Sequence, residues 1–393
     1  MAKTRRPALK TIYGQPSYTI QTQQISMSVS QHAGCVAPVR FYRDTNTPIE
    51  PLAIAPWWKE KMPPGTPPVI KALRGDFFCM PFGGSKTAYK GIAYPPHGET
   101  ANRNWQFQDF VQKQSGKTLH LCMDLNLQKG RVEKALSIVE GQNVIYSRHR
   151  ISKLSGPMSF SHHATLQFPD RPGAAKLSFS RFIHAATFYE RVESPDVGTY
   201  SSLKPNSVIK DLTKVPLIDG TTTDLTRYPN RRGYEDIAMI CADPTLELAW
   251  SAATFAQEHY VWFNLKNPKI LTSTVLWFSN KGRYYAPWNG RHINVMGMEE
   301  GTTFWGDGIA NSAKNNDFTK RGIQTCHRFR SSEIFDVPVI MGVARIPRGF
   351  QEVLDIQVLS EDHIRLIGHE KFKVDVAVNT DFLKSATIED LIL

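Results

Sequence analysis

The hydrophobic pattern of the chain is mainly an alternation of apolar and polar residues, which is typical of half-buried β-strands. Turn signals separate the alternating segments, for example at Gly14–Pro16, Pro63–Gly65, Asn280–Gly282 and Pro347–Gly349. The alternation predicts strands within six segments: Ser17–Val29, Thr118–Leu127, Asn143–Ile151, Ala175–Phe182, Lys269–Phe278 and Glu370–Val378.

Helical periodicity is scarce along the chain. The best candidate is Asp243–Ala256, in which Leu248, Ala249 and Ala252 fall on one stripe, and the acidic tail Thr387–Leu393 could form a turn of helix. Strand after strand with few helices predicts an all-β fold, and specifically a large antiparallel β-sandwich with few short helices.

The chain shows neither an internal repeat nor a low-complexity linker. We therefore expect an N-terminal extension over residues 1–16 and a single β-sandwich domain over residues 17–393. Two segments break the strand rhythm, Pro51–Pro68, rich in Pro and Trp, and Leu212–Asp236, rich in Thr, Asp and Arg. Long loops at the rim of a rigid sheet commonly carry binding residues, so both are expected to shape a pocket.

The composition is that of a globular protein, with 393 residues of which 41% are hydrophobic and 11% aromatic. The sequence contains no apolar run long enough to cross a membrane. Its basic first residues lack the apolar core of a secretory signal, so we expect a soluble, cytoplasmic protein. Five widely spaced cysteines without a Cys-x-x-Cys pair indicate reduced thiols rather than disulfides or a zinc site.

The chain is basic, with 47 Lys and Arg against 36 Asp and Glu and a formal net charge of +11. The excess is spread out, since the densest clusters, Lys3–Arg6 and Arg148–Lys153, are short. Without a basic helix or an aromatic RNA-binding motif, this charge does not predict a nucleic-acid partner. An anionic sugar, either a sugar phosphate or a uronate, is the more natural use for it.

Four polar clusters carry the candidate chemistry. Sugar hydroxyls need planar hydrogen-bond donors, and sugar C–H faces need aromatic surface; the second cluster offers both, with His97, Arg103 and Trp105. In the third, His162 and His163 are adjacent on a strand, so only one can face a given pocket. In the fourth, a buried strand over residues 293–298 is expected to end at Glu299 and Glu300. The clusters are Leu73–Gly84, Tyr94–Trp105, Pro157–Pro169 and Trp288–Trp305.

The order and the local sequences of these clusters resemble the motifs of the galactose mutarotase (aldose 1-epimerase) superfamily, particularly those of its branch related to hexose-6-phosphate mutarotases. Arg74–Gly83 is similar to that branch's Arg-Gly-Gly-x-Pro-x-Cys-x-Pro-x-Phe-Gly segment, and His97–Trp105 to its His-Gly-Phe-Ala-Arg-Asn-x-x-Trp segment. His163–Phe168 looks like its Asn-His-Thr-Tyr-Phe-Asn-Leu strand, and Gly297–Glu299 like its Cys-Leu-Glu-Pro strand end; Val139–Tyr146 also looks family-like.

The resemblance implies the supersandwich fold and a cofactor-independent isomerase that interconverts sugar anomers. His163 would be the general acid that protonates the ring oxygen, and Glu299 the base that deprotonates the anomeric hydroxyl. The two would converge on a shared open cavity from opposite sides of a pyranose. Substrate contacts would come from Arg74, His97, Arg103, Trp105 and Glu300.

The sequence departs from the family pattern at several positions. Asp76 and Phe77 stand where Gly or small apolar residues are usual, Glu99 and Thr100 where Phe and Ala are common, and Glu300 where Pro follows the base. Glu300 could even exchange roles with Glu299. The family's further aspartate has two candidates, Asp236 and Asp307.

Several alternatives stay open at this point. The same fold could serve a non-catalytic carbohydrate-binding or sugar-sensing protein. A lyase of this shape would bring an additional helical domain, and a glycosidase would need two opposed carboxylates. A phosphate-binding nucleotide loop is absent from the sequence, and His162, His163, His292 and His327 match no standard metal spacing. We expect a small-molecule sugar or sugar phosphate as ligand, no metal or cofactor, and a monomer or homodimer.

Overall fold

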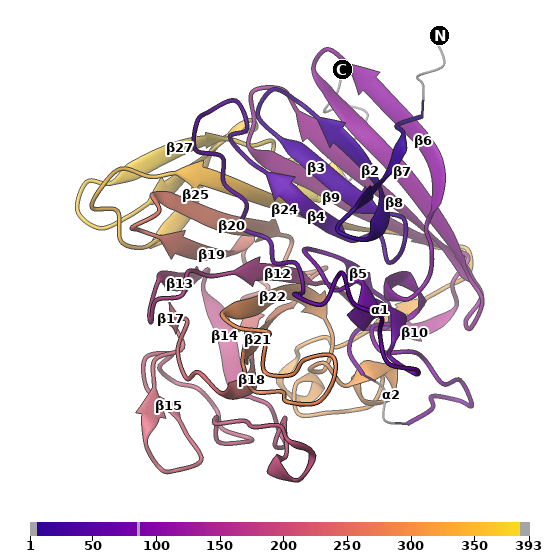
Figure 1. Ribbon diagram of the computed structural model, residues 1–393, viewed down its shortest axis with the longest axis vertical. Helices are drawn as coiled ribbons and strands as arrows, with labels where there is room; N and C mark the ends of the chain where they lie inside the picture. Colours follow the sequence, from indigo (N-terminus) through magenta and orange to yellow (C-terminus); the bar gives the residue numbers. More distant parts are fainter. Residues whose placement is uncertain (1–5, 85–86, 386–393) are drawn as a thin grey trace.

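The computed structural model describes residues 6–84 and 87–385, and its body consists of two large antiparallel sheets (Figure 1). The nine-stranded sheet has the order β17 (Arg227–Tyr228), β13 (Ala175–Phe179), β19 (Ala249–Phe255), β20 (Tyr260–Lys266), β24 (Ile334–Arg345), β9 (Val144–Ser152), β8 (Gly130–Val139), β7 (Gly116–Leu125) and β6 (Gln106–Lys113). The seven-stranded sheet has the order β14 (Phe182–Thr187), β18 (Tyr234–Ala242), β21 (Ser273–Asn280), β22 (Val295–Thr302), β11 (Phe160–His162) and β5 (Phe78–Cys79), and β12 (Ala164–Gln167) also pairs with β22.

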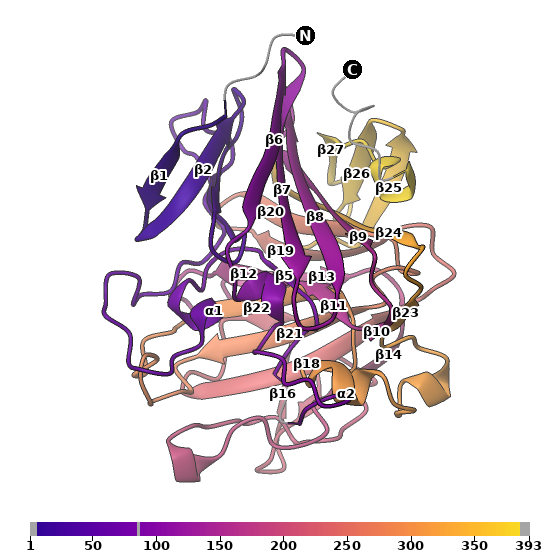
Figure 2. The ribbon, with the colours of Figure 1, turned by 90° about the vertical axis from the view of Figure 1, so that its right-hand side faces the viewer.

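Smaller sheets extend this body at both ends of the chain. Figure 2 shows the N-terminal sheet and the C-terminal sheet on either side of the long strands β6–β9. The N-terminal sheet is β1 (Leu9–Ile12), β2 (Gln15–Gln21), β3 (Ser26–Ser30) and β4 (Val36–Arg40), and the C-terminal sheet is β25 (Asp355–Ser360), β26 (His363–Ile367) and β27 (Lys373–Ala377). Two short pairs are β10 (Gly156–Met158) with β23 (His327–Phe329), and β15 (Val215–Pro216) with β16 (Thr222–Thr223).

Helices are few and short in the described residues. The α-helices are α1 (Pro68–Lys71), α2 (Gly308–Ser312) and α3 (Phe382–Ser385), and the 3₁₀ turns are η1 (Glu99–Ala101), η2 (Pro195–Val197) and η3 (Thr319–Arg321). The prediction of an all-β fold with few short helices is therefore confirmed. Within the described ranges, no helix has both the length and the apolar character needed to cross a membrane.

The seven-stranded sheet is buried on both faces. Along β21, Leu276 and Phe278 belong to the main core, which also contains side chains of the nine-stranded sheet. The alternate residues Val275 and Trp277 belong to a second cluster on the other face, with Trp57 from a loop. Because strand side chains alternate between faces, one strand supplies both the core and the wall of whatever lies beyond it.

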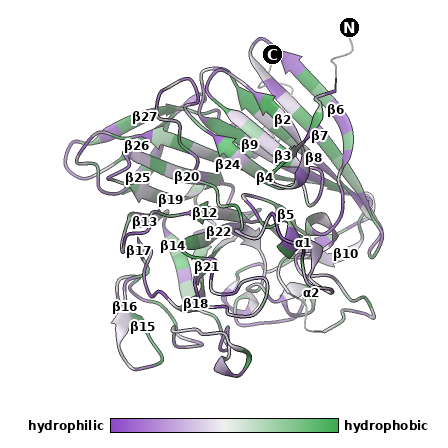
Figure 3. Cartoon of the chain, in the orientation of Figure 1, coloured by the Kyte–Doolittle hydropathy of each residue, from purple (hydrophilic) through white to green (hydrophobic). Residues whose placement is uncertain are grey.

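Most of the predicted strands lie within the segments that the alternation indicated. Thr118–Leu127 coincides with β7, Asn143–Ile151 with β9 and Glu370–Val378 with β27, whereas Ser17–Val29 divides into β2 and β3. Figure 3 shows repeated changes between hydrophobic and hydrophilic colour along single strands such as β6. Strands with one solvated face are those that a period of two reveals most clearly.

Two predictions of secondary structure are wrong. Asp243–Ala256 forms no helix but a turn followed by β19, all of whose residues are buried. The strand expected over residues 293–298, with Glu299 and Glu300 at its end, is β22. It begins at Val295, continues through both glutamates to Thr302 and is likewise buried throughout. In a strand covered on both faces, apolar and polar residues need not alternate, so its sequence does not show a period of two. The helical turn expected at Thr387–Leu393 lies outside the described residues.

The two segments predicted as loops are largely irregular. Pro51–Pro68 contains only isolated bridges before α1 begins, and one of them joins Ile54 to Arg74. Leu212–Asp236 contains the short strands β15, β16 and β17 and the first residues of β18. At the N-terminus, β1 pairs with β2, so residues 9–12 belong to the N-terminal sheet.

Candidate active site

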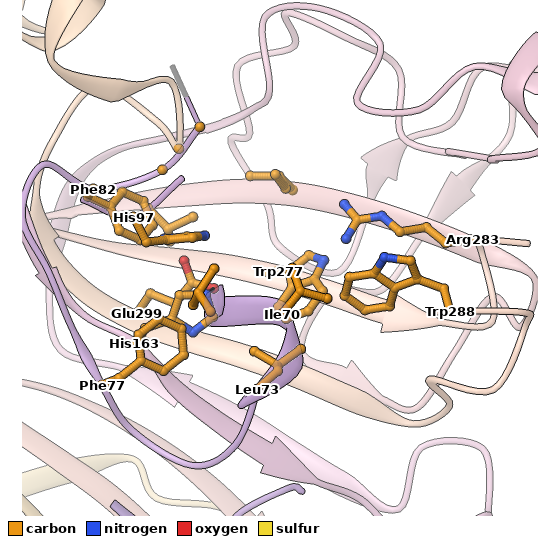
Figure 4. A pocket seen from close by; sticks show the side chains of 16 residues that line it. Ile70, Leu73, Phe77, Phe82, His97, His163, Trp277, Arg283, Trp288 and Glu299 are labelled. Atoms are coloured by element: carbon orange, nitrogen blue, oxygen red, sulfur yellow. Dashed lines mark ion pairs between the residues drawn. The ribbon is translucent and has the colours of Figure 1, made fainter. Parts of the chain in front are cut away.

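A cavity of about 190 Å³ lies against the outer face of the seven-stranded sheet (Figure 4). Its floor comes from β18, β21 and β22, and its sides come from α1 and from loops around Phe82, His97 and Trp288. The volume exceeds the roughly 150 Å³ of a cavity that admits benzene. It is below the ~300–1,000 Å³ of sites for drug-sized ligands, so it suits one ring-sized molecule.

The lining of the cavity is mostly apolar. Four lining residues are ionisable, namely His97, His163, Arg283 and Glu299, and three are glycines. The remaining lining residues among those described are aliphatic or aromatic: Val69, Ile70, Leu73, Phe77, Phe82, Ile237, Val275, Trp277 and Trp288.

The structure brings His163 and Glu299 together at one end of the cavity. Nε2 of His163 lies 3.2 Å from Oε1 of Glu299, and the two side chains are 5% and 3% exposed. On its other nitrogen, the imidazole lies 3.2 Å from Oγ1 of Thr165, and Phe77 stacks on the ring with centroids 4.4 Å apart. These contacts hold the ring in place. His163 lines the cavity and His162 does not, as predicted for adjacent positions on a strand.

Glu299 owes its position to the glycine two residues before it on the same face of β22. A Cβ atom at Gly297 would lie 2.1 Å from Oε1 of Glu299, so the carboxyl group occupies space that any side chain at Gly297 would take. Among the described residues, Oε1 has no partner with hydrogen-bond geometry and is buried. It is therefore a buried polar atom at the cavity wall, with the imidazole of His163 beside it.

Burial sets the protonation of both groups. It lowers the pKa of His163 well below the ordinary value, and the neighbouring His97 adds to the effect. Burial alone raises the pKa of Glu299 well above its ordinary value. An isolated charge pair is costly to desolvate, and both pKa shifts favour the uncharged forms, a protonated carboxyl beside a neutral imidazole.

The side-by-side contact corrects one geometric expectation. The imidazole and the carboxyl group do converge on one cavity, but at 3.2 Å they leave no room for a sugar ring between them. A ligand would meet both groups from the same side.

His97 completes the polar end of the cavity, as its motif predicted. Its backbone is in the left-handed region, with φ of 62°, and the next residue, Gly98, continues this turn at φ of 74°. Nδ1 lies 3.3 Å from the sulfur of Cys79. Burial, with a smaller contribution from Arg283, lowers the pKa of His97 to about 4, so the imidazole is neutral. Its ring centroid is 5.1 Å from that of His163.

Arg283 lies at the opposite end of the cavity and was not among the predicted site residues. Its Nε donates to Oε1 of Glu193 at 2.6 Å, and its guanidinium lies over the ring of Trp288, 4.7 Å from the centroid. Burial disfavours its charge, but Glu235 and Glu193 outweigh burial and raise its pKa. The only sequence signal for Arg283 is its position directly after the predicted turn Asn280–Gly282.

A buried carboxyl group, that of Glu235, lies behind the cavity wall and holds several of its side chains. Glu235 accepts hydrogen bonds from Nε1 of Trp277 at 3.0 Å and from Oγ of Ser279 at 2.9 Å. Burial raises the pKa of Glu235 to about 7, against the opposing effect of Arg283. Oγ of Ser279 also lies 2.6 Å from Nδ1 of His292, whose ring stacks on Trp277. Glu235 thus fixes one wall of the cavity without lining it.

Arg74 does not contact the cavity, contrary to the prediction. Its guanidinium is buried and donates to the backbone carbonyls of Ala72, Ile12 and Tyr13, at 3.1, 3.0 and 2.8 Å. An arginine whose donors are taken by carbonyls of the N-terminal hairpin is structural. It attaches β1 and β2 to the loop that follows α1.

Arg103 and Trp105 also lie away from the cavity. Arg103 pairs with Glu99 at 2.6 Å, and Glu99 accepts further hydrogen bonds from the backbone of Asn126 and Leu127. Trp105 is fully buried and donates from Nε1 to the carbonyl of Thr100 at 2.9 Å. Glu99, which departs from the family pattern, therefore caps the loop after β7 and uses Arg103 as its counter-ion.

Glu300 lies on the opposite face of β22 and cannot replace Glu299 in the cavity. It is fully buried, forms an ion pair with Lys266, and accepts from Ser251 at 2.6 Å and Thr274 at 2.7 Å. Asp76, another residue that differs from the family pattern, contacts His162: its carboxylate lies 3.3 Å from Nδ1 of that imidazole.

Neither candidate for the family's further aspartate lines the cavity. Asp236 accepts from the backbone of Ser202 and Leu203, at 2.9 Å each. Asp307 accepts hydrogen bonds from Tyr189 and Asn311. Both carboxylates organise loops.

Comparison with solved structures finds the same fold in proteins of low sequence identity. A candidate aldose 1-epimerase from Escherichia coli K12 aligns with a TM-score of 0.55 and 13% identity, over 84% of this chain and 99% of that chain. A galactose mutarotase-like protein from Clostridium acetobutylicum gives 0.55 and 13%, over 86% and 98%. A galactose mutarotase related enzyme from Lactobacillus acidophilus gives 0.51 and 11%, over 84% and 97%.

Sequence comparison adds nothing to this likeness, because no protein-family model and no curated protein matches the chain. At these identities the solved structures establish the fold alone. That fold is the one the four sequence clusters implied.

Proposed function

We propose that this chain, which has the galactose mutarotase-like fold, exchanges the anomers of a sugar by proton transfer between the ligand and the pair His163–Glu299. The observation that carries the proposal is the 3.2 Å approach of Nε2 of His163 to Oε1 of Glu299 at the wall of a ring-sized cavity. Solved proteins named for aldose 1-epimerase or mutarotase activity share the fold, which supports the same chemistry here.

The reaction requires one proton donor and one proton acceptor close together. In a cyclic sugar the ring oxygen and the anomeric hydroxyl are bonded to the same carbon. Two groups side by side can therefore reach both atoms at once. General acid–base groups placed in this way typically contribute 10²–10⁴-fold to a rate.

The protonation state of the pair assigns the roles for ring opening. The protonated carboxyl of Glu299 donates its proton to the ring oxygen while the neutral imidazole of His163 takes the proton of the anomeric hydroxyl. The bond between the anomeric carbon and the ring oxygen breaks, and an aldehyde and a free hydroxyl form. After the aldehyde rotates, the reverse transfers close the ring on its other face. These roles are the reverse of those that the family resemblance implied.

Polarimetry on freshly dissolved α-glucose, α-galactose and their 6-phosphates tests the proposal. The wild-type protein should accelerate the change of rotation, and His163→Asn should lower the rate by about 100-fold or more. The matched control is His162→Asn, which alters the adjacent imidazole on the other face and should retain the rate. A protein that binds a sugar but leaves the rotation changing at the buffer rate would instead favour carbohydrate binding without catalysis.

A further inference from the structure

The cavity offers few hydrogen-bond partners for a ligand. Among the described residues that line it, none is Ser, Thr, Asn, Gln or Asp, and the side chains that carry polar groups are the four ionisable ones and two tryptophans. Sites that hold fully hydroxylated sugars need a polar partner for each buried hydroxyl. A hydroxyl buried without a partner loses its hydrogen bonds to water and gains none in return, which costs binding free energy.

Some of the polar atoms at the cavity already contact other side chains of the protein and are not available to a ligand. His97 contacts Cys79 through Nδ1, and His163 contacts Thr165 through Nδ1, so each presents one nitrogen to the cavity. Arg283 uses Nε and one terminal nitrogen on Glu193.

The indole N–H groups of both tryptophans and several backbone groups of the glycines are already paired. The indole N–H of Trp277 donates to Glu235, and that of Trp288 is paired with Tyr285. Gly84 donates its backbone N–H to the carbonyl of Gly306 at 3.0 Å.

The remaining polar atoms are concentrated at the two ends of the cavity. Figure 4 shows His97, His163 and Glu299 at one end and Arg283 at the other, with Ile70, Leu73 and Trp277 between them. A ligand whose reducing carbon lies at the His163–Glu299 end therefore places the middle of its ring against hydrocarbon. An aldohexose carries a hydroxyl or hydroxymethyl group on every ring carbon, so it would bury hydroxyls there without partners among the described side chains.

We infer that the ligand is a deoxygenated monosaccharide, a sugar in which a hydroxyl that would face this apolar wall is replaced by hydrogen. The inference rests on the proposed function and specifies its substrate class. A C–H group facing Ile70, Leu73 and Trp277 removes apolar surface from water and leaves no polar atom unpaired.

The test measures anomer exchange by saturation-transfer NMR for pairs of sugars that differ by one hydroxyl. D-glucose is compared with 2-deoxy-D-glucose and with 6-deoxy-D-glucose. D-galactose, L-galactose and L-mannose are each compared with their own 6-deoxy form. We expect kcat/KM to be at least about tenfold higher for at least one deoxy sugar than for its parent, which corresponds to about 1.4 kcal/mol. Parents that react as fast as or faster than every deoxy partner would overturn the inference and leave the proposed function standing. If no sugar exchanges, the proposed function fails, and the ratio of dissociation constants for the same pairs decides the inference.

A variant of the cavity wall provides an independent test. Ile70→Thr places a hydroxyl on the apolar middle of the wall and should reduce the preference for the deoxy sugar at least about threefold. Ile270→Thr is the matched control, because Ile270 is likewise partly buried but packs against the main core. A preference in Ile70→Thr equal to that of the wild type would contradict the inference.

Discussion

At the scale of single residues, the site depends on how burial changes two ordinary side chains. An exposed glutamate and histidine would carry opposite charges at slightly acidic pH. In the cavity the pKa of Glu299 rises and that of His163 falls, both mainly through burial. Both shifts favour a neutral acid beside a neutral base. In the proposed ring opening the acid loses a proton and the base gains one, so the pair becomes an ion pair, and ring closure neutralises it again.

This protonation state can be measured directly. The infrared difference spectrum of wild type minus Glu299→Gln at neutral pH should contain the C=O band of a protonated carboxylic acid, and the band should disappear as the pH is raised. Glu235, whose pKa is raised to about 7, is present in both proteins and cancels in the difference. A spectrum with carboxylate bands only at neutral pH would contradict the neutral pair.

Gly297 is the second residue on which the site depends. Gly297→Ala should leave the fold intact, because the atoms that a methyl group would meet are the end of one flexible side chain. The carboxyl group of Glu299 must then move, and a displacement of about 1 Å can cost roughly 100-fold in rate. We expect kcat for anomer exchange to fall by about 10–100-fold with little change in KM. An unchanged kcat would show that the present position of Glu299 is not required.

At the scale of elements, β22 is a strand with two separate functions on its two faces. Glu299 faces the cavity, and Glu300, the next residue, faces the core, where it pairs with Lys266. The alternation of a strand therefore places one of two adjacent glutamates at the cavity and the other in the core.

The core face of β22 predicts a pattern of stabilities. Lys266→Met should lower the free energy of unfolding by about 3–5 kcal/mol, because it leaves Glu300 buried without its counter-ion. The double variant Lys266→Met/Glu300→Gln should recover most of this loss, since no charge remains. Urea unfolding of the single and double variants measures both values. A double variant as unstable as the sum of its single variants would show that the ion pair is not the relevant interaction.

The sequence predicted several of the long strands, including β21, which is buried throughout, but it did not predict every strand of that kind. Strand β7 follows the alternation, but β19 is buried throughout and was mistaken for a helix. Within the site, His97, His163 and Glu299 were predicted from local motifs. Arg74, a motif residue, supports the N-terminal hairpin instead, and Arg283 was not predicted at all. Which of several arginines reaches a cavity depends on tertiary contacts such as Glu193, and no local pattern records them.

At the scale of the whole molecule, the two large sheets form the core and leave the outer face of the smaller sheet to be covered by loops. The cavity lies beneath these loops, on rigid strands. This arrangement holds the polar groups of the cavity in place while the covering segments shape its space.

Burying Glu299 should make the stability of the whole protein depend on pH. A carboxyl group whose pKa is higher in the folded chain than in the unfolded chain stabilises the fold below its unfolded pKa, and this contribution is lost as pH rises toward the folded pKa. Glu299→Gln should therefore match the wild type in acid and become more stable than it as pH rises, by on the order of 2 °C in Tm or more. Thermal unfolding of both proteins across pH measures the difference. A Tm difference that is constant with pH would exclude a raised pKa for Glu299.

The central claim is that the pair in the cavity, and no other acid or base, exchanges sugar anomers. Saturation-transfer NMR of anomer exchange tests it most directly, with the wild type, Glu299→Gln, and the double variant Lys266→Met/Glu300→Gln, which removes the neighbouring carboxylate on the core face. We predict rapid exchange with the wild type and the double variant, and a rate at least about 100-fold lower with Glu299→Gln. Equal exchange with the wild type and Glu299→Gln would contradict the claim.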